Sequence, residues 1–191
     1  MPPFSYTAGM KKDSPPAHLD VKAFAHAAEL LGGQDLLLNY ERLMDETQGL
    51  GAENMLKWSA RGELRVDAVG AEQVWLHLTI ETSIPLTCQR CMGSVDVAVL
   101  VQQSFRFCDN EEMAEAQDVD AEEDVLALNP DLSLMELVED EVLMALPLVP
   151  RHEVCPVEVK LAVADSAFEA ALLEKTQPFA ALAQLKTGKA D

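Results

Sequence analysis

The clearest pattern in the chain is an alternation of apolar and other residues along one stretch in its middle. Every second residue from Val74 to Ile80 is aliphatic, and the residues between them are polar or aromatic. This two-residue period is typical of a strand with one buried face. The ranges 56–69 and 95–107 read in the same way, with short connections between them. Three consecutive strands predict an antiparallel meander, and closure of this sheet into a barrel is left open.

Apolar residues at helical spacing lie on both sides of this strand region. Asp20 is a suitable N-cap for a short helix, which we expect to stop at the Gly32–Gly33 pair. Ser133 stands three residues before Glu136, as in a capping box, and Pro147 marks the end of the helix that follows. Short helices packed beside an antiparallel sheet predict an α+β fold.

The distribution of proline and of apolar residues suggests where the folded part lies. Residues 1–19 contain four prolines and show no apolar period, so we expect a flexible leader. Residues 20–187 are expected to form a single domain, which a short helix after Pro178 completes. Residues 188–191 remain as a tail.

The apolar content indicates a folded protein that does not cross a membrane. Apolar residues make up 49% of the chain, enough for a core, but no apolar run approaches the roughly 20 residues that cross a bilayer. The first residues lack a basic segment followed by an apolar run, so no export is expected. We therefore expect a cytoplasmic protein with no membrane partner.

The net charge of −19 is concentrated in one part of the chain. Between Phe107 and Pro150 there are 14 acidic residues and no Lys or Arg. Residues 109–130 are expected to form an acidic loop, which serves either solubility or the attraction of basic proteins. On the helix that follows, we expect Glu139, Asp140 and Glu141 to bind a partner. The same charge repels a phosphate backbone, so direct RNA binding is disfavoured.

Three cysteines and one histidine form the strongest chemical pattern. Cys88 and Cys91 are separated by two residues, and His152 and Cys155 repeat this spacing further along the chain. Three sulfurs and one imidazole suit a tetrahedral structural zinc site, for which these four residues are the predicted ligands. Packing of reduced cysteines and thiol redox chemistry remain as alternatives. Cys108 lies outside the pattern.

The sequence is compatible with two other functions. A thiol-dependent or zinc-dependent enzyme centred on Cys88 and Cys91 needs an exposed thiolate or an open metal position. A closed zinc site with four protein ligands indicates instead that the metal stabilises the fold. A small basic and aromatic patch is a further candidate for RNA contact, although a solvated strand face is the favoured interpretation. Its members are Lys57, Trp58, Arg61 and Arg65.

Several segments together resemble a known protein family. The segments are residues 88–91, 137–147, 149–152, 155 and 178–186. In this order and spacing they are similar to the YceD family, the large ribosomal RNA subunit accumulation proteins, over roughly residues 20–187. The resemblance implies a role in synthesis, processing or stability of large-subunit (23S) ribosomal RNA, and it supplies no catalytic residues. We therefore expect a non-enzymatic ribosome biogenesis factor that contacts a ribosomal protein or a large-subunit assembly factor.

Overall fold

The computed structural model describes residues 10–11, 14–67, 70–159, 165 and 167–168. The chain divides into two compact units, residues 1–154 and 155–191, and every element named below lies in the first unit. Its strands are β1 (Met10–Lys11), β2 (Leu30–Leu36), β3 (Met55–Val66), β4 (Glu72–Thr87), β5 (Ser94–Cys108) and β6 (Asp124–Ala127). Its helices are α1 (Val21–His26), η1 (Leu37–Asn39), α2 (Glu41–Glu46), α3 (Glu111–Asp118) and α4 (Leu134–Ala145). The helix expected after Pro178 lies outside the described residues.

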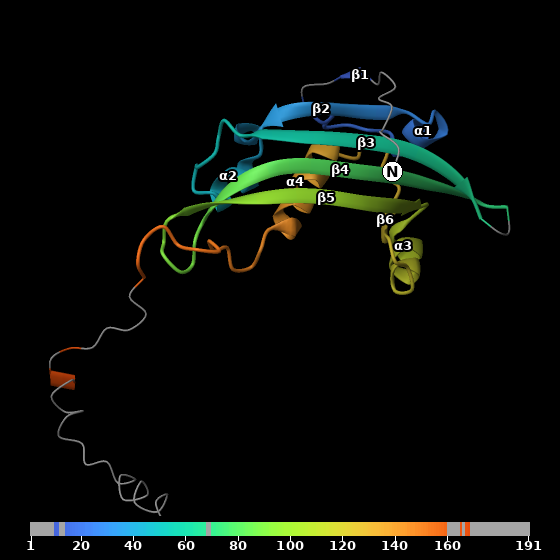
Figure 1. Cartoon of the computed structure of the whole chain (residues 1–191). Helices are drawn as coiled ribbons and strands as arrows, with labels where there is room; N and C mark the ends of the chain where they lie inside the picture. Colours follow the sequence, from blue (N-terminus) through green and yellow to red (C-terminus); the bar gives the residue numbers. More distant parts are fainter. Residues whose placement is uncertain (1–9, 12–13, 68–69, 160–164, 166, 169–191) are drawn as a thin grey trace, which may run out of the picture. The chain divides into compact units, whose positions relative to one another are not determined.

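The strands form one mixed sheet in the order β1-β2-β3-β4-β5-β6 (Figure 1). From β2 to β5 each strand pairs antiparallel with the next, which confirms the predicted meander and the α+β class. The two edge pairs, β1 with β2 and β5 with β6, are parallel. The sheet is open and does not close into a barrel: its two edge strands have only two and four residues and lie at opposite ends of the strand order.

The core lies on the face of the sheet that the helices cover. Along β4, Leu76, Leu78 and Ile80 are fully or almost fully buried, as the two-residue period predicts. On α4, Leu134 and Val138 are fully buried in the same cluster. The Ser133 Oγ accepts a hydrogen bond from the backbone N–H of Glu136 at 3.2 Å, so the predicted cap of α4 is present. No helix in the described part of the chain is long and apolar enough to span a membrane.

Helix α1 begins as predicted but ends earlier. The Asp20 Oδ1 accepts the N–H of Ala23 at 3.0 Å, which confirms the N-cap. The helix ends at His26, and Ala28 takes a positive φ of 48°. The expected stop at Gly32–Gly33 is wrong, because both glycines belong to β2 and pair with β3. Strand pairing overrides the helix-ending tendency of glycine here.

The segment expected to be a leader is partly attached to the body. The N–H of Leu134 donates to the Pro16 carbonyl at 3.0 Å, and the N–H of Leu19 donates to the Leu132 carbonyl at 2.9 Å. Strand β1 adds a short pairing with β2. Backbone hydrogen bonds therefore hold residues 14–19 against the start of α4, before the boundary expected at residue 20.

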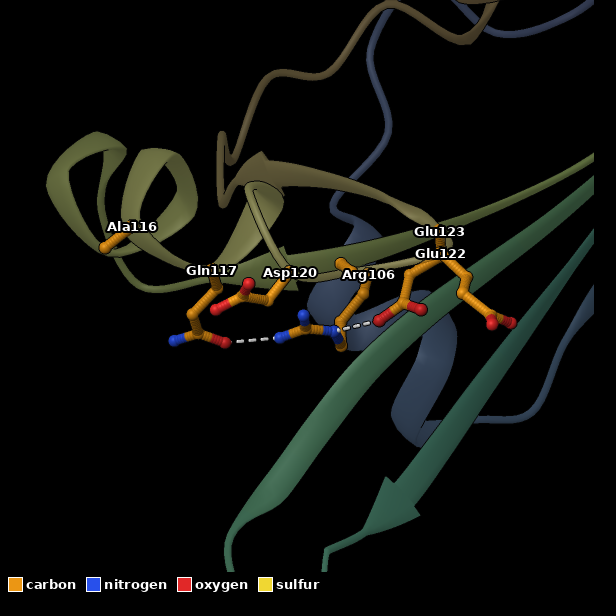
Figure 2. A pocket seen from close by; sticks show the side chains of 7 residues that line it. Arg106, Ala116, Gln117, Asp120, Glu122 and Glu123 are labelled. Carbon is orange, nitrogen blue, oxygen red and sulfur yellow. Dashed lines mark hydrogen bonds and ion pairs between the residues drawn. The ribbon is translucent and has the colours of Figure 1, made fainter.

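The acidic range 109–130 is not a loop, and this prediction is wrong. Asn110 caps α3 by accepting the N–H of Met113 at 2.9 Å, and residues 124–127 form β6. Arg106 of β5 explains how so acidic a segment folds back onto the sheet. Its Nε donates to Glu123 at 2.6 Å, and its Nη1 bonds the Gln117 side chain (Figure 2). One partly buried cation thus neutralises Glu123, the acid that directly precedes β6.

Candidate metal centre

A tight turn after β4 orients the first two cysteines. The N–H of Cys88 donates to the Gly93 carbonyl at 2.8 Å, and the N–H of Met92 donates to the Cys88 carbonyl at the same distance. Met92 takes a positive φ of 60° within the turn. Because the chain reverses over so few residues, both sulfurs face the same side, as the binding of one metal ion by both requires.

A second segment, which follows α4, is hydrogen-bonded to this turn. The N–H of Gln89 donates to the Pro150 carbonyl at 2.9 Å. The Arg90 guanidinium donates to the carbonyls of His152 and Glu153 at 2.7 and 3.1 Å. These bonds place His152 beside the cysteine turn although the two are about sixty positions apart in sequence.

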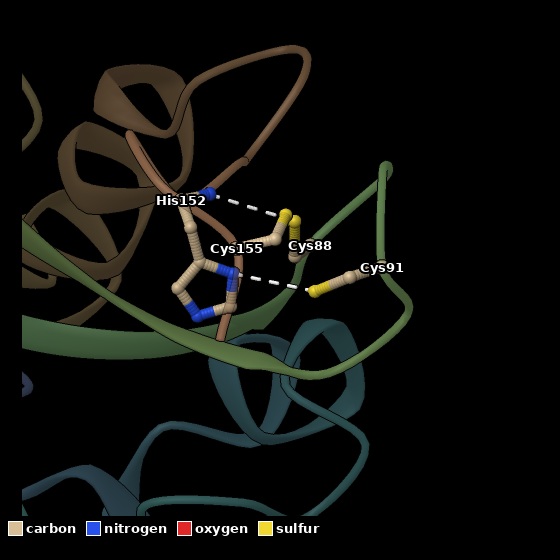
Figure 3. A group of neighbouring side chains, drawn as sticks. All are labelled: Cys88, Cys91, His152 and Cys155. Atoms are coloured by element: carbon tan, nitrogen blue, oxygen red, sulfur yellow. Dashed lines mark hydrogen bonds between the residues drawn. The ribbon is translucent and has the colours of Figure 1, made fainter. Parts of the chain in front are cut away.

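The four predicted metal ligands converge (Figure 3). The ligand atoms of Cys88, Cys91, His152 and Cys155 all lie within 4.8 Å of one another. The Sγ of Cys91 lies 3.4 Å from Nδ1 of His152. Tetrahedral zinc with ordinary bond lengths separates its ligand atoms by about 3.5–3.8 Å, so this donor set fits zinc. Cys155 directly follows the first unit along the chain.

The surroundings of Cys88 favour its thiolate form. Burial raises the pKa of this thiol, but backbone N–H groups of Cys91, His152 and Arg90 more than offset burial and lower the pKa to about 5. The N–H of His152 lies 3.5 Å from the Cys88 sulfur. A thiolate is the form that binds a metal, so the backbone prepares this ligand before any ion arrives.

The three acids expected to bind a partner lie in three different environments. Glu139 is 8% exposed and accepts hydrogen bonds from the N–H groups of Arg42 and Leu43 at 2.8 and 3.2 Å. Its other oxygen accepts Nε of Arg42 at 2.9 Å. Asp140 also binds the Arg42 guanidinium, with a side chain that is 48% exposed. Glu141 is 7% exposed. Burial raises its pKa most, and the nearby negative charges of Asp124 and Asp140 raise it further.

Glu139 therefore has a structural task inside the molecule. Tyr40, at the N-cap position of α2, makes no side-chain cap. The carboxylate of Glu139 on α4 replaces that cap by accepting N–H groups of the first turn of α2. The sequence pattern shows the acid but gives no sign of its partner, 97 residues away.

The basic and aromatic residues considered for RNA contact lie on two opposite faces of the sheet. Trp58 is buried in the core, whereas Lys57, Arg61 and Arg65 belong to the other face of β3. Arg61 and Arg65 bind Glu63 at 3.1 and 2.8 Å. Hydrogen bonds from Arg65 lower the pKa of Glu63 to about 2 against the effect of burial. A neighbouring carboxylate thus already engages both guanidinium groups.

Sequence reasoning missed one row of polar groups on this face. His77 bonds Glu63 through Nε2 and Ser104 through Nδ1, each at 2.8 Å. The three residues lie on adjacent strands, and the two-residue period was the signal that places them on one face. The row thus links β3, β4 and β5 through side-chain hydrogen bonds.

The fold and site together define a class of small α+β protein, in which an open sheet supports a candidate metal centre made from two chain segments. Residues 76–186 match the family described as "Large ribosomal RNA subunit accumulation protein YceD". Since the match spans more than half of the chain, this protein belongs to the YceD family. No solved structure matches the chain.

Proposed function

We propose that this protein is a non-enzymatic, cytoplasmic ribosome biogenesis factor for the large subunit. Family membership supports a role in the accumulation of large-subunit ribosomal RNA, and it is the observation that carries the proposal. The factor supports synthesis, processing or stability of 23S ribosomal RNA through acidic contacts with a basic protein. That partner is a large-subunit ribosomal protein or another assembly factor.

The acidic surface around α3 supports contact with a basic protein. Glu111, Glu112 and Glu115 are exposed on this helix, whereas Glu123 is engaged by Arg106. With a net charge of −19, the field of the molecule attracts cationic segments and repels bare RNA. After folding, α3 thus still presents carboxylates that have no internal task among the described contacts.

We assign the Cys88, Cys91, His152 and Cys155 cluster a structural zinc ion. Four protein ligands close a tetrahedral site, so the ion stabilises the packing of the cysteine turn against the segment after α4. The competing function is a thiol-dependent or zinc-dependent enzyme at Cys88, and the low pKa of that thiol is the observation that favours it. Fast alkylation of Cys88 in a protein purified without zinc would support the enzyme.

Deletion of the gene tests the proposed function. Large-subunit particles and 23S ribosomal RNA should decrease in the deletion strain relative to the small subunit, at normal temperature or in the cold. Unchanged subunit profiles under both conditions would refute the assignment.

Charge reversal on α3 tests the acidic contact. Glu111→Lys with Glu112→Lys should fail to restore large-subunit RNA, because it removes carboxylates that attract the partner. The matched control is Glu29→Lys with Glu53→Lys, which changes the net charge equally at exposed positions elsewhere. Equal restoration by both double variants would show that the location of the charge is irrelevant.

A further inference from the structure

The segment that follows α4 exposes an unusual run of apolar side chains. Met144, Leu148 and Val149 are 68%, 100% and 60% exposed within six residues. Met92, in the cysteine turn that contacts this segment, is 71% exposed. Single exposed apolar residues are ordinary on protein surfaces, whereas a group of them marks an interaction site.

A groove lies beside this apolar run. It encloses about 380 Å³ between the end of β4, the end of α4 and the end of α2. Leu86 and Gln89 contribute one wall, and Leu143, Leu146 and Leu148 contribute another. An opening of this size accepts one or two apolar side chains from a partner.

The charges around the groove identify the kind of partner. Among the described residues that line it, Glu46 is the one charged residue, and none is Lys or Arg. The wall from α4 and the following segment belongs to the stretch between positions 107 and 150 that contains no cation. The described lining offers no positive group to bare RNA, whereas a cationic protein segment is attracted by both Glu46 and the overall charge.

The cysteine turn of the candidate metal centre is hydrogen-bonded to the chain that follows this surface. Hydrogen bonds from Gln89 to Pro150 and from Arg90 to His152 connect the apolar segment to the cysteine turn. His152 lies four residues after Leu148, so the segment is held on one side by α4 and on the other by the cysteine turn. A surface that is ordered before binding loses less entropy when the partner arrives.

We propose that residues 143–150 and the adjoining groove bind a basic protein segment through one or more of its apolar side chains. The inference rests on the proposed function and adds the site of contact. Acidic residues elsewhere on the surface steer the cationic segment toward the body, and the groove supplies the desolvated contact that retains it.

Photo-crosslinking in cells tests the location of the contact. A photo-crosslinking residue at position 148 should form a product with a basic large-subunit ribosomal protein or with a basic assembly factor. The matched position is Leu100, which is 65% exposed on β5 and does not line the groove. Products with RNA, with a second copy of this chain or with its own residues 169–191 would overturn the proposal, as would the same products from both positions.

A pair of leucine variants measures the contribution of the groove. Both Leu148 and Leu100 are exposed, so Leu148→Ser and Leu100→Ser should keep the wild-type melting temperature and zinc content. Affinity for the crosslinked partner, purified, should fall about tenfold with Leu148→Ser and stay constant with Leu100→Ser. Equal affinities of the two variants would overturn the proposal.

Complementation separates this inference from the proposed function. If the deletion strain loses 23S ribosomal RNA, Leu148→Ser should restore it poorly and Leu100→Ser fully. Full restoration by Leu148→Ser would overturn the groove contact alone. A deletion strain with normal ribosomal RNA would instead refute the proposed function.

Discussion

Replacing Glu139 by alanine is the sharpest test of how the helices are held together. The carboxylate accepts three hydrogen bonds, from the N–H groups of Arg42 and Leu43 and from Nε of Arg42. Removing it leaves the first turn of α2 without a cap and the guanidinium without one of its two carboxylate partners. Leu43 is fully buried, so water has little access to replace the lost acceptor.

The expected cost follows from these contacts. Loss of a helix cap costs about 1 kcal/mol, and a buried donor left unsatisfied adds about 1–3 kcal/mol. The Arg42 side chain is 48% exposed, so solvent compensates its charge and its ion pair adds about 1 kcal/mol or less. Glu139→Ala should therefore lower the free energy of unfolding by about 2–4 kcal/mol. Glu139→Gln keeps an acceptor oxygen and should lose about half as much.

Urea denaturation followed by tryptophan fluorescence measures this loss, because Trp58 and Trp75 are both buried in the same unit as Glu139. Glu136→Ala is the matched control, since it removes the same charge from an exposed position on the same helix. The control should change stability by less than about 0.5 kcal/mol. If the free energy of unfolding of Glu139→Ala lies within about 0.5 kcal/mol of that of the control, Glu139 does not cap α2 in solution.

Three further predictions concern the metal, one buried acid and one glycine. Cys91→Ser should abolish stoichiometric zinc binding and lower the melting temperature, whereas Cys108→Ser should keep the zinc; metal analysis of the purified variants decides, and equal zinc contents would contradict the site. Burial raises the pKa of Glu141, so its charged form destabilises the fold at neutral pH. Glu141→Gln should then raise the melting temperature at pH 7, with a gain that shrinks as the pH falls through the raised pKa and the wild-type carboxyl protonates; no gain at pH 7 would disprove this reasoning. At Gly62, a Cβ atom would lie 2.6 Å from the Phe24 carbonyl oxygen, so Gly62→Ala should cost about 1–3 kcal/mol in urea denaturation, and wild-type stability would show that α1 shifts freely.

The acidic region shows why local pattern was insufficient there. Between positions 109 and 124 the residues are mostly acidic, with few large apolar side chains, and charge alone predicts a solvated loop. The structure folds this range around small apolar contacts between Cys108, Ala114 and Val125, with Arg106 as the counter-charge. Neither the cluster nor the counter-charge is visible until β5 and β6 lie side by side.

The sequence by itself determined the central strands, the capped helix α4 and the two closely spaced pairs Cys88/Cys91 and His152/Cys155. These features depend on residues close together in the chain, where backbone period and short spacings act directly. Only the tertiary structure decided that Gly32–Gly33 enters a strand, that the sheet stays open and that Glu139 binds Arg42. Each of these outcomes depends on which distant element supplies the hydrogen-bond partner, and that choice is made by packing over the whole body.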